Sequence, residues 1–251
     1  MHCHCPTLRI KRAMTCLKWQ ANWQAADSVK WAGEPGQPNE VLLSAVVSDG
    51  VVDLTTDETD DVHMRGLEKG AFQFCSKLRS VELPESLRRL GHGSFDNCKS
   101  LMHVEIPAGV SELGNWTFRF CNTLRTVILP EGISMLPIFL FYGCESLVTV
   151  GLPSSLRTIG ERAFESCPSL VNVNFSHILN VTDIGIAAFC GCGFTQVALP
   201  PLVKSVPDDA FSCCGSLSKV ALPDGLETIG EGAFNNCHPS LSIDVPQTVR
   251  R

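Results

Sequence analysis

Apolar residues recur along this chain in a fixed order, and their period changes partway through each recurrence. A phenylalanine and, three places later, a cysteine appear together eight times. The phenylalanines stand at positions 72, 95, 118, 141, 164, 189, 211 and 234, with spacings of 23, 23, 23, 23, 25, 22 and 23 residues. A period of this length predicts a stacked repeat protein, because one unit is too short to enclose a core of its own.

Each unit contains a short alternating stretch after the cysteine. In the first unit Val81 and Leu83 point to one side and Glu82 to the other, which predicts a strand. A proline follows the stretch in seven of the eight units and ends the pairing. Leu87 and Leu90 supply a second apolar pair. Residues 71–78 place apolar side chains three residues apart, which predicts a short helical turn.

The unit Leu-x-x-Val-x-Leu-Pro-x-x-Leu-x-x-Leu-Gly-x-x-x-Phe-x-x-Cys resembles the BspA type of leucine-rich repeat over residues 65–251. The resemblance implies a right-handed solenoid that binds other molecules and shares no catalytic residues. The expected fold class is an α/β repeat: a leucine-rich repeat solenoid with a short parallel sheet and short helical turns, in eight units of about 23 residues. Pro137 replaces a turn glycine in the fourth unit, and two residues are inserted between His177 and Asp183 in the fifth, where we expect irregular curvature.

The repeated cysteine has four interpretations: a disulfide, a metal ligand, a nucleophile or core filling. Core filling is favoured, because free cysteine behaves as a small apolar residue and is often buried. Parallel stacked side chains seldom reach the torsion of about 90° that a disulfide needs. The chain has thirteen cysteines, and eight of them have a packing explanation, so their number does not demand an oxidising compartment. The sequence therefore predicts a cytoplasmic protein, with an organelle or the cell surface as alternatives.

Composition and motifs argue against several classes of function. A formal charge of −6 offers no basic stripe for nucleic acid. The chain has no apolar run of the roughly 18 residues that a membrane span requires. It has no phosphate-binding loop, dinucleotide fingerprint or nucleophile motif, so we expect no catalytic residues, no cofactor and no enzyme activity. A zinc site formed by His2, Cys3, His4 and Cys5, or a thiol enzyme, are remote alternatives.

The N-terminal sequence differs from the repeats. Residues 1–40 predict a helical or disordered segment and a linker, with a helix ended by Gly33 and Pro35. Its basic, acid-poor start is also weakly typical of an organelle transit peptide. Residues 41–64 predict an irregular capping rung with two strands around Asp49 and Gly50. The solenoid is expected to occupy residues 65–251.

The repeat breaks off at Arg251, partway through a unit and without a recognisable polar cap. An uncapped edge invites pairing with another chain. Either self-association covers this edge, or the sequence is a fragment.

Binding is expected on the outward columns of the sheet face, which is predicted to be concave. These columns flank the central apolar residue of each strand: Ser80, His103, Thr126, Thr149, Asn172, Gln196, Lys219 and Ser242, and then Glu82, Glu105, Ile128, Gly151, Asn174, Ala198, Ala221 and Asp244. The candidate binding residues among them are Glu82, Glu105, Ile128 and Asn174. Both columns are mostly small and polar and have no aromatic anchor, so a solvated surface is an equally good interpretation.

A second candidate surface lies around the position two residues before each core phenylalanine. That position is Gly70, Gly93, Trp116, Phe139, Arg162, Ala187, Asp209 and Gly232 in successive units. Trp116 and Phe139, with the nearby Ile138, Leu140, Phe120 and Tyr142, predict an exposed apolar patch that docks a protein partner. The alternative is that the turn at Pro137 folds Ile138 and Leu140 inward as packing.

The sequence therefore predicts a non-catalytic leucine-rich repeat scaffold that mediates protein–protein interaction. The alternative function is extracellular or cell-surface recognition or adhesion, which the resemblance to bacterial surface proteins implies. Asn115, Asn174 and Asn180 each begin a glycosylation acceptor pattern. Glycans found by mass measurement would favour the alternative. The partner and the biological process are not specified by the sequence.

Overall fold

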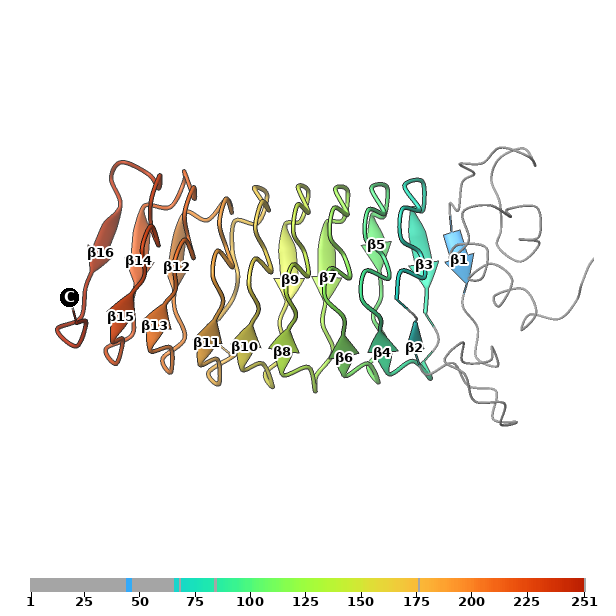
Figure 1. The fold of residues 1–251 in the computed structure, drawn as a ribbon, viewed down its shortest axis with the longest axis horizontal. Coiled ribbons are helices and arrows are strands. Elements are labelled where there is room, and N and C mark those ends of the chain that lie inside the picture. The colour runs from blue at the N-terminus through green and yellow to red at the C-terminus, as the bar shows by residue number, and fades with distance from the viewer. Residues whose placement is uncertain (1–43, 47–65, 68, 84, 176, 251) are drawn as a thin grey trace, which may run out of the picture.

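Each repeat forms one rung of a solenoid in the computed structural model, which describes residues 44–46, 66–67, 69–83, 85–175 and 177–250. The rungs lie side by side in one elongated row (Figure 1). We number them 1 to 8 by their core phenylalanine, from Phe72 in rung 1 to Phe234 in rung 8. The helix expected near the N-terminus and most of the expected capping rung lie outside the described residues.

Two rows of short parallel strands run along the solenoid (Figure 1). The first row consists of β1 (Ser44–Val46), β3 (Ser80–Glu82), β5 (His103–Val104), β7 (Thr126–Ile128), β9 (Thr149–Gly151), β12 (Gln196–Ala198), β14 (Lys219–Ala221) and β16 (Ser242–Asp244). The second row consists of β2 (Gly66–Leu67), β4 (Arg89–Leu90), β6 (Glu112–Leu113), β8 (Met135–Leu136), β10 (Thr158–Ile159), β11 (Asp183–Ile184), β13 (Ser205–Val206) and β15 (Thr228–Ile229). The first row is the predicted strand. The second row forms at the second apolar pair, which was not predicted to be extended.

Strand register confirms the outward columns of the first row. Ser80 pairs with His103, Thr126 with Thr149, and Gln196 with Lys219, so equivalent residues of neighbouring rungs stand side by side. The row divides into two sheets, ordered β1-β3-β5-β7-β9 and β12-β14-β16. Residues 172–174 of rung 5 form no assigned strand between them. The sheet face is therefore interrupted at the rung that carries the insertion.

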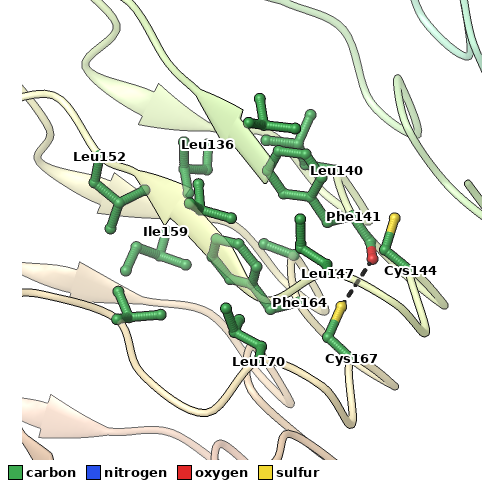
Figure 2. Close-up of a cluster of buried hydrophobic side chains, with 14 of the residues drawn as sticks. Leu136, Leu140, Phe141, Cys144, Leu147, Leu152, Ile159, Phe164, Cys167 and Leu170 are labelled. Atoms are coloured by element: carbon green, nitrogen blue, oxygen red, sulfur yellow. Dashed lines mark hydrogen bonds between the residues drawn. The ribbon is translucent and has the colours of Figure 1, made fainter. Parts of the chain in front are cut away.

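The core of the solenoid is a continuous stack of phenylalanine rings. The eight core rings have neighbours at centroid distances of 5.2–5.6 Å and lie within 3–18° of parallel. Leucine, isoleucine and valine side chains surround them, as the rungs of Phe141 and Phe164 show (Figure 2). Burying one such ring stabilises the fold by roughly 1.5–3 kcal/mol. The stack continues through rung 5, so the insertion leaves the core intact.

The turns that carry these rings are not helical, and the expected short helical turns are wrong. Among the described residues there is no helix. The residues two before and two after every core phenylalanine have φ between 52° and 70°. A left-handed residue turns its peptide groups away from the helical i to i−4 pattern. The backbone N–H groups of Trp116, Phe118 and Phe120 instead donate to carbonyls of the next rung at 2.8–3.1 Å.

The two-residue insertion in rung 5 is anchored in the core. Ile178 and Val181 are fully buried. The Nε2 atom of His177 lies 2.9 Å from the carbonyl oxygen of Leu152 in rung 4. The extra residues therefore form a packed loop beside the sheet face. The irregularity expected here takes the form of a break in strand pairing.

Candidate functional site

The repeated cysteines form a column beside the phenylalanine stack and are part of the core. Those of rungs 1 to 7 are buried, which confirms the core-filling interpretation. Each thiol from Cys98 onward also donates a hydrogen bond to the carbonyl oxygen of the previous rung's core phenylalanine, at 3.0–3.2 Å. The bond from Cys167 to Phe141 is drawn in Figure 2. Sequence reasoning missed this second role, which an aliphatic residue could not perform.

Burial makes these thiols unreactive. It raises the pKa of Cys75, Cys167 and Cys214 from 9.0 to about 12. A buried, protonated thiol is a poor nucleophile and a poor metal ligand. In the described part of the chain, no three His, Cys, Asp or Glu side chains are grouped so as to hold a metal ion. The cluster from His2 to Cys5 lies outside the described residues. Among the residues that are described, no helix is long and apolar enough to cross a membrane.

A groove with a volume of about 490 Å³ opens on the sheet face where the sheet is interrupted. Its lining comes from rungs 5, 6 and 7: Asn172, Val173, Asn174, Phe175, Leu179, Gln196, Val197, Ala198, Leu199, Pro200, Pro201, Lys219 and Ala221. Two causes produce it. The inserted loop places Leu179 beside the sheet face. In the second outward column, rungs 6 and 7 have the small residues Ala198 and Ala221, whereas rung 3 has the larger Ile128.

The groove combines an apolar floor with a polar side. Val173, Phe175, Val197 and Leu199 are buried and form part of its lining. The first outward column contributes the exposed amides of Asn172 and Gln196 and the ammonium group of Lys219. Lys219 forms no ion pair with another residue that the structure describes. The lining therefore offers hydrogen bonds, one positive charge and apolar contact, but no acidic group.

The aromatic patch lies on the turn face of rungs 3 and 4. The ring of Tyr142 makes edge contacts with Phe120 at 5.2 Å and with Phe139 at 5.3 Å. The guanidinium of Arg119 lies 5.8 Å from the ring of Trp116 and 5.5 Å from that of Phe120. Arg162 lies 5.6 Å from the ring of Phe139. The arginines therefore cover part of the aromatic surface.

Charged neighbours hold the two arginines in place. Asp96, which is buried, accepts two hydrogen bonds from Arg119 at 2.8 and 2.9 Å and a third from Gln73 at 2.8 Å. The bond to Asp96 raises the pKa of Arg119. Arg162 lies between Glu161 and Glu165, at 3.4 and 3.6 Å. Desolvation raises the pKa of Glu165 despite this cation. The patch is thus an organised cluster of rings and ion pairs.

Comparison with known proteins identifies the repeat. A BspA type leucine rich repeat region matches in six copies at residues 65–181 and 172–251, which together exceed half of the chain. The chain belongs to the BspA-type leucine-rich repeat family. No curated protein matches the chain significantly.

The chain is also similar to solved structures of bacterial leucine-rich repeat proteins. A leucine rich cell surface protein from Faecalibacterium prausnitzii is 25% identical, with a TM-score of 0.52 over 81% of this chain and 65% of that one. This chain therefore spans less than two-thirds of that relative's length. The leucine-rich repeat protein of T. pallidum is also 25% identical, with a TM-score of 0.48 over 85% of this chain and 88% of that one.

The candidate residues of this leucine-rich repeat protein fall into separate places. Asn174 lines the groove. Glu82, Glu105 and Ile128 are exposed on the same face but belong to rungs 1 to 3, away from it. Sequence reasoning did not single out Lys219, although the insertion in rung 5 and the small alanines near Lys219 indicated that this part of the sheet face is irregular.

The aromatic candidates also divide. Trp116 and Ile138 are exposed by 37% and 38%, and Phe120, Phe139 and Tyr142 are half-buried. Leu140 is fully buried and packs in the core, so its assignment to a binding surface is corrected. The Pro137 turn therefore directs Leu140 into the core, as the packing alternative predicts, and leaves Ile138 exposed. That the exposed part of the patch docks a protein partner stays a prediction.

Proposed function

We propose that this leucine-rich repeat protein is a non-catalytic recognition module that binds an extended segment of a protein ligand in the groove of rungs 5 to 7. The main support for this proposal is the groove itself, in which polar side chains from consecutive rungs lie beside an apolar floor. Neighbouring rungs stand about 4.8 Å apart, so Asn172 and Gln196 can bond to the backbone of a segment that crosses them. Lys219 then favours a segment with an acidic side chain.

The state of the cysteines supports a role without catalysis. The column thiols pack in the core and donate hydrogen bonds to backbone carbonyls, and burial raises the pKa of Cys75 to about 12. A thiol nucleophile needs the opposite conditions, an accessible position and a lowered pKa.

Displayed peptide libraries test the groove. We expect selection on the whole chain to enrich peptides with an acidic residue next to an apolar one. Ala198→Trp, which fills the groove, and Lys219→Glu, which reverses its charge, should each weaken a selected peptide by tenfold or more. Ile128→Trp and Thr126→Glu are matched controls, because they change the same two columns in rung 3. Equal binding by all four variants would overturn the proposal.

The aromatic patch supplies the competing binding face. Trp116→Ala combined with Phe139→Ser removes two of its exposed or half-buried rings. We expect this double variant to bind the selected peptides like the wild type. If the double variant lost binding and Ala198→Trp kept it, the aromatic patch would be the peptide-binding site in place of the groove.

We further propose that the protein acts at the cell surface. Support comes from the F. prausnitzii relative, which is described as a leucine rich cell surface protein. The expectation of a cytoplasmic location finds no support in the comparisons. Labelling of intact cells with a membrane-impermeant amine reagent should modify the native protein. Labelling only after lysis would reject the surface location and leave the groove proposal standing.

A further inference from the structure

Two described cysteines stand outside the buried column. Cys190 directly follows the core phenylalanine of rung 6 and is half-buried. Cys213 comes two residues after the core phenylalanine of rung 7 and is exposed. Core packing, which explains the repeated cysteines, does not explain these two.

The backbone ladder brings the two residues close together. The N–H group of Gly191 donates to the carbonyl oxygen of Ser212 at 2.8 Å. Gly191 holds in rung 6 the left-handed position that Cys213 holds in rung 7, with φ of 70° and 58°. Cys190 therefore stands one residue along and one rung across from Cys213. With about 4.8 Å between rungs and about 3.8 Å between consecutive Cα atoms, their Cα atoms are roughly 6 Å apart, inside the range for disulfides.

The side chains also meet. Desolvation chiefly raises the pKa of Cys190 to about 11, with further contributions from Glu165 and from a hydrogen bond to the Cys213 side chain. The Sγ atom of Cys213 lies 3.7 Å from Ser212 Oγ and 3.9 Å from Asn236 Nδ2. Polar groups therefore surround the Cys213 sulfur atom at the surface.

This arrangement differs from that of the column cysteines. Residues such as Cys167 and Cys192 occupy the same position in successive rungs, and each directs its thiol to a phenylalanine carbonyl. Cys190 and Cys213 belong to different columns of the turn, one and two residues after the phenylalanine. They approach diagonally, so the geometric objection to stacked, parallel cysteines does not apply to them.

We propose that Cys190 and Cys213 are a disulfide site that cross-links rungs 6 and 7 when the protein meets a small disulfide oxidant such as glutathione disulfide. The thiolate of the exposed Cys213 attacks one sulfur of the oxidant, forms a mixed disulfide and expels one small thiolate, which takes up a proton. Cys190 then loses its proton to solvent and attacks the Cys213 sulfur, which releases the second small thiol. Two protein thiols are oxidised, and one small disulfide is reduced to two thiols.

The cross-link would join the two rungs that carry much of the proposed groove. Rung 6 supplies Gln196 and Ala198 to its lining, and rung 7 supplies Lys219 and Ala221. The cysteines lie in the turns that lead into β12 and β14. An oxidising surface environment would therefore fix the spacing of these rungs. The disulfide site itself does not depend on the groove having a ligand.

Peptide mapping of the whole oxidised chain tests the proposal. After incubation with glutathione disulfide, alkylation and trypsin digestion without reduction, we expect residues 163–204 to be linked to residues 205–219. Fragmentation of the linked peptides should place the bond between Cys190 and Cys213. The oxidised protein should also have a higher thermal unfolding midpoint than the reduced protein.

Two single variants separate the cross-link from general oxidation. Cys190→Ser should retain a glutathione adduct on Cys213, because the resolving thiol is absent. Cys213→Ser should give neither the adduct nor the cross-link, and Cys237→Ser should cross-link like the wild type. Circular dichroism of each variant checks its fold. Separate glutathione adducts on Cys190 and Cys213 in the folded wild type, or a link through Cys214, would overturn the proposal.

Discussion

The turns of the solenoid present an inner and an outer set of columns, which share one backbone and differ in what they require of a side chain. Inward, every rung has phenylalanine and cysteine. Outward, the positions two before and two after the phenylalanine range from glycine to tryptophan. Both outer positions are left-handed in all eight rungs. The backbone is thus equally regular on both sides, while side-chain identity is constrained only inside.

The inner columns are constrained because each side chain packs against its own copy. The rings stack on one another at 5.2–5.6 Å, and each thiol from Cys98 onward donates to the phenylalanine carbonyl of the rung before it. The outer positions require only a positive φ, which glycine and asparagine adopt with little strain. Stability is therefore expected to depend on the inner columns, and binding specificity on what the outer surface carries.

Alkaline pH should break the inner column as a whole and give the largest effect. The folded pKa of Cys75, Cys167 and Cys214 is about 12, against an ordinary value of 9.0. Unfolded thiols lose their protons above pH 9, while the folded ones keep theirs until about pH 12. Unfolding therefore becomes easier as pH rises through this window, by up to about 1.4 kcal/mol per thiol per pH unit.

Urea unfolding at pH 8, 9, 10 and 11 measures this pH dependence. Cys167→Ala removes one of the shifted thiols, so its free energy of unfolding should fall less steeply with pH than that of the wild type. Equal slopes for the two proteins would show that other groups, such as lysines, cause the alkaline sensitivity.

Phe141→Ala should give the next largest loss. Its fully buried ring is stacked between Phe118 at 5.5 Å and Phe164 at 5.4 Å. Removing it leaves a cavity, and each of the two neighbouring rings loses one of its two stacking partners, which should cost about 3–5 kcal/mol of unfolding free energy. Ile128→Ala is the control, because its side chain is 71% exposed and the change should be within about 0.5 kcal/mol. Chemical denaturation compares the two. A loss below about 1 kcal/mol for Phe141→Ala would contradict a core that depends on the stack.

Cys144→Ala should cost less, about 1–2 kcal/mol, because the Phe118 carbonyl keeps its second hydrogen bond from the Cys121 N–H group. The same denaturation assay, under reducing conditions, measures this difference. Cys213→Ala is the matched outer variant, since its exposed thiol leaves no cavity, and its unfolding free energy should be unchanged. An equal loss in both variants would mean that the inner cysteines have no special structural role.

The number of rungs, the first row of strands and the buried column were predictable from the sequence. A spacing near 23 residues keeps equivalent residues in register, and alternation around Val81 shows which side chains point inward. The turn conformation was not predictable in the same way. Apolar residues three apart fit both a helical turn and a chain of β-turns. Eleven of the left-handed residues are not glycine, so the usual signal was absent at most of these positions.

The candidate groove was only partly predictable. Register placed Asn174, Ala198 and Lys219 on the outward face. The depth of the groove, however, depends on the interrupted strand pairing at rung 5 and on the packing of the inserted loop. The packing of the loop is in turn set by the burial of Ile178. An insertion shows where regularity fails, but it does not show which residues turn inward.

Trp116→Gly should have the smallest effect and sharpens the contrast between inner and outer positions. Trp116 has φ of 61° and contacts Arg119. Glycine would relieve roughly 1–2 kcal/mol of left-handed strain. It would also lose about 0.5–1 kcal/mol of cation–π attraction and add about 0.4–1 kcal/mol of entropy to the unfolded chain. The net change should be near zero by denaturation. Gly93→Ala, at the equivalent position with φ of 59°, adds the strain without a compensating contact and should destabilise the fold by about 1 kcal/mol. If Trp116→Gly were as costly as Phe141→Ala, the outer ring would be part of the stabilising core, and the separation between the two sets of columns would not hold.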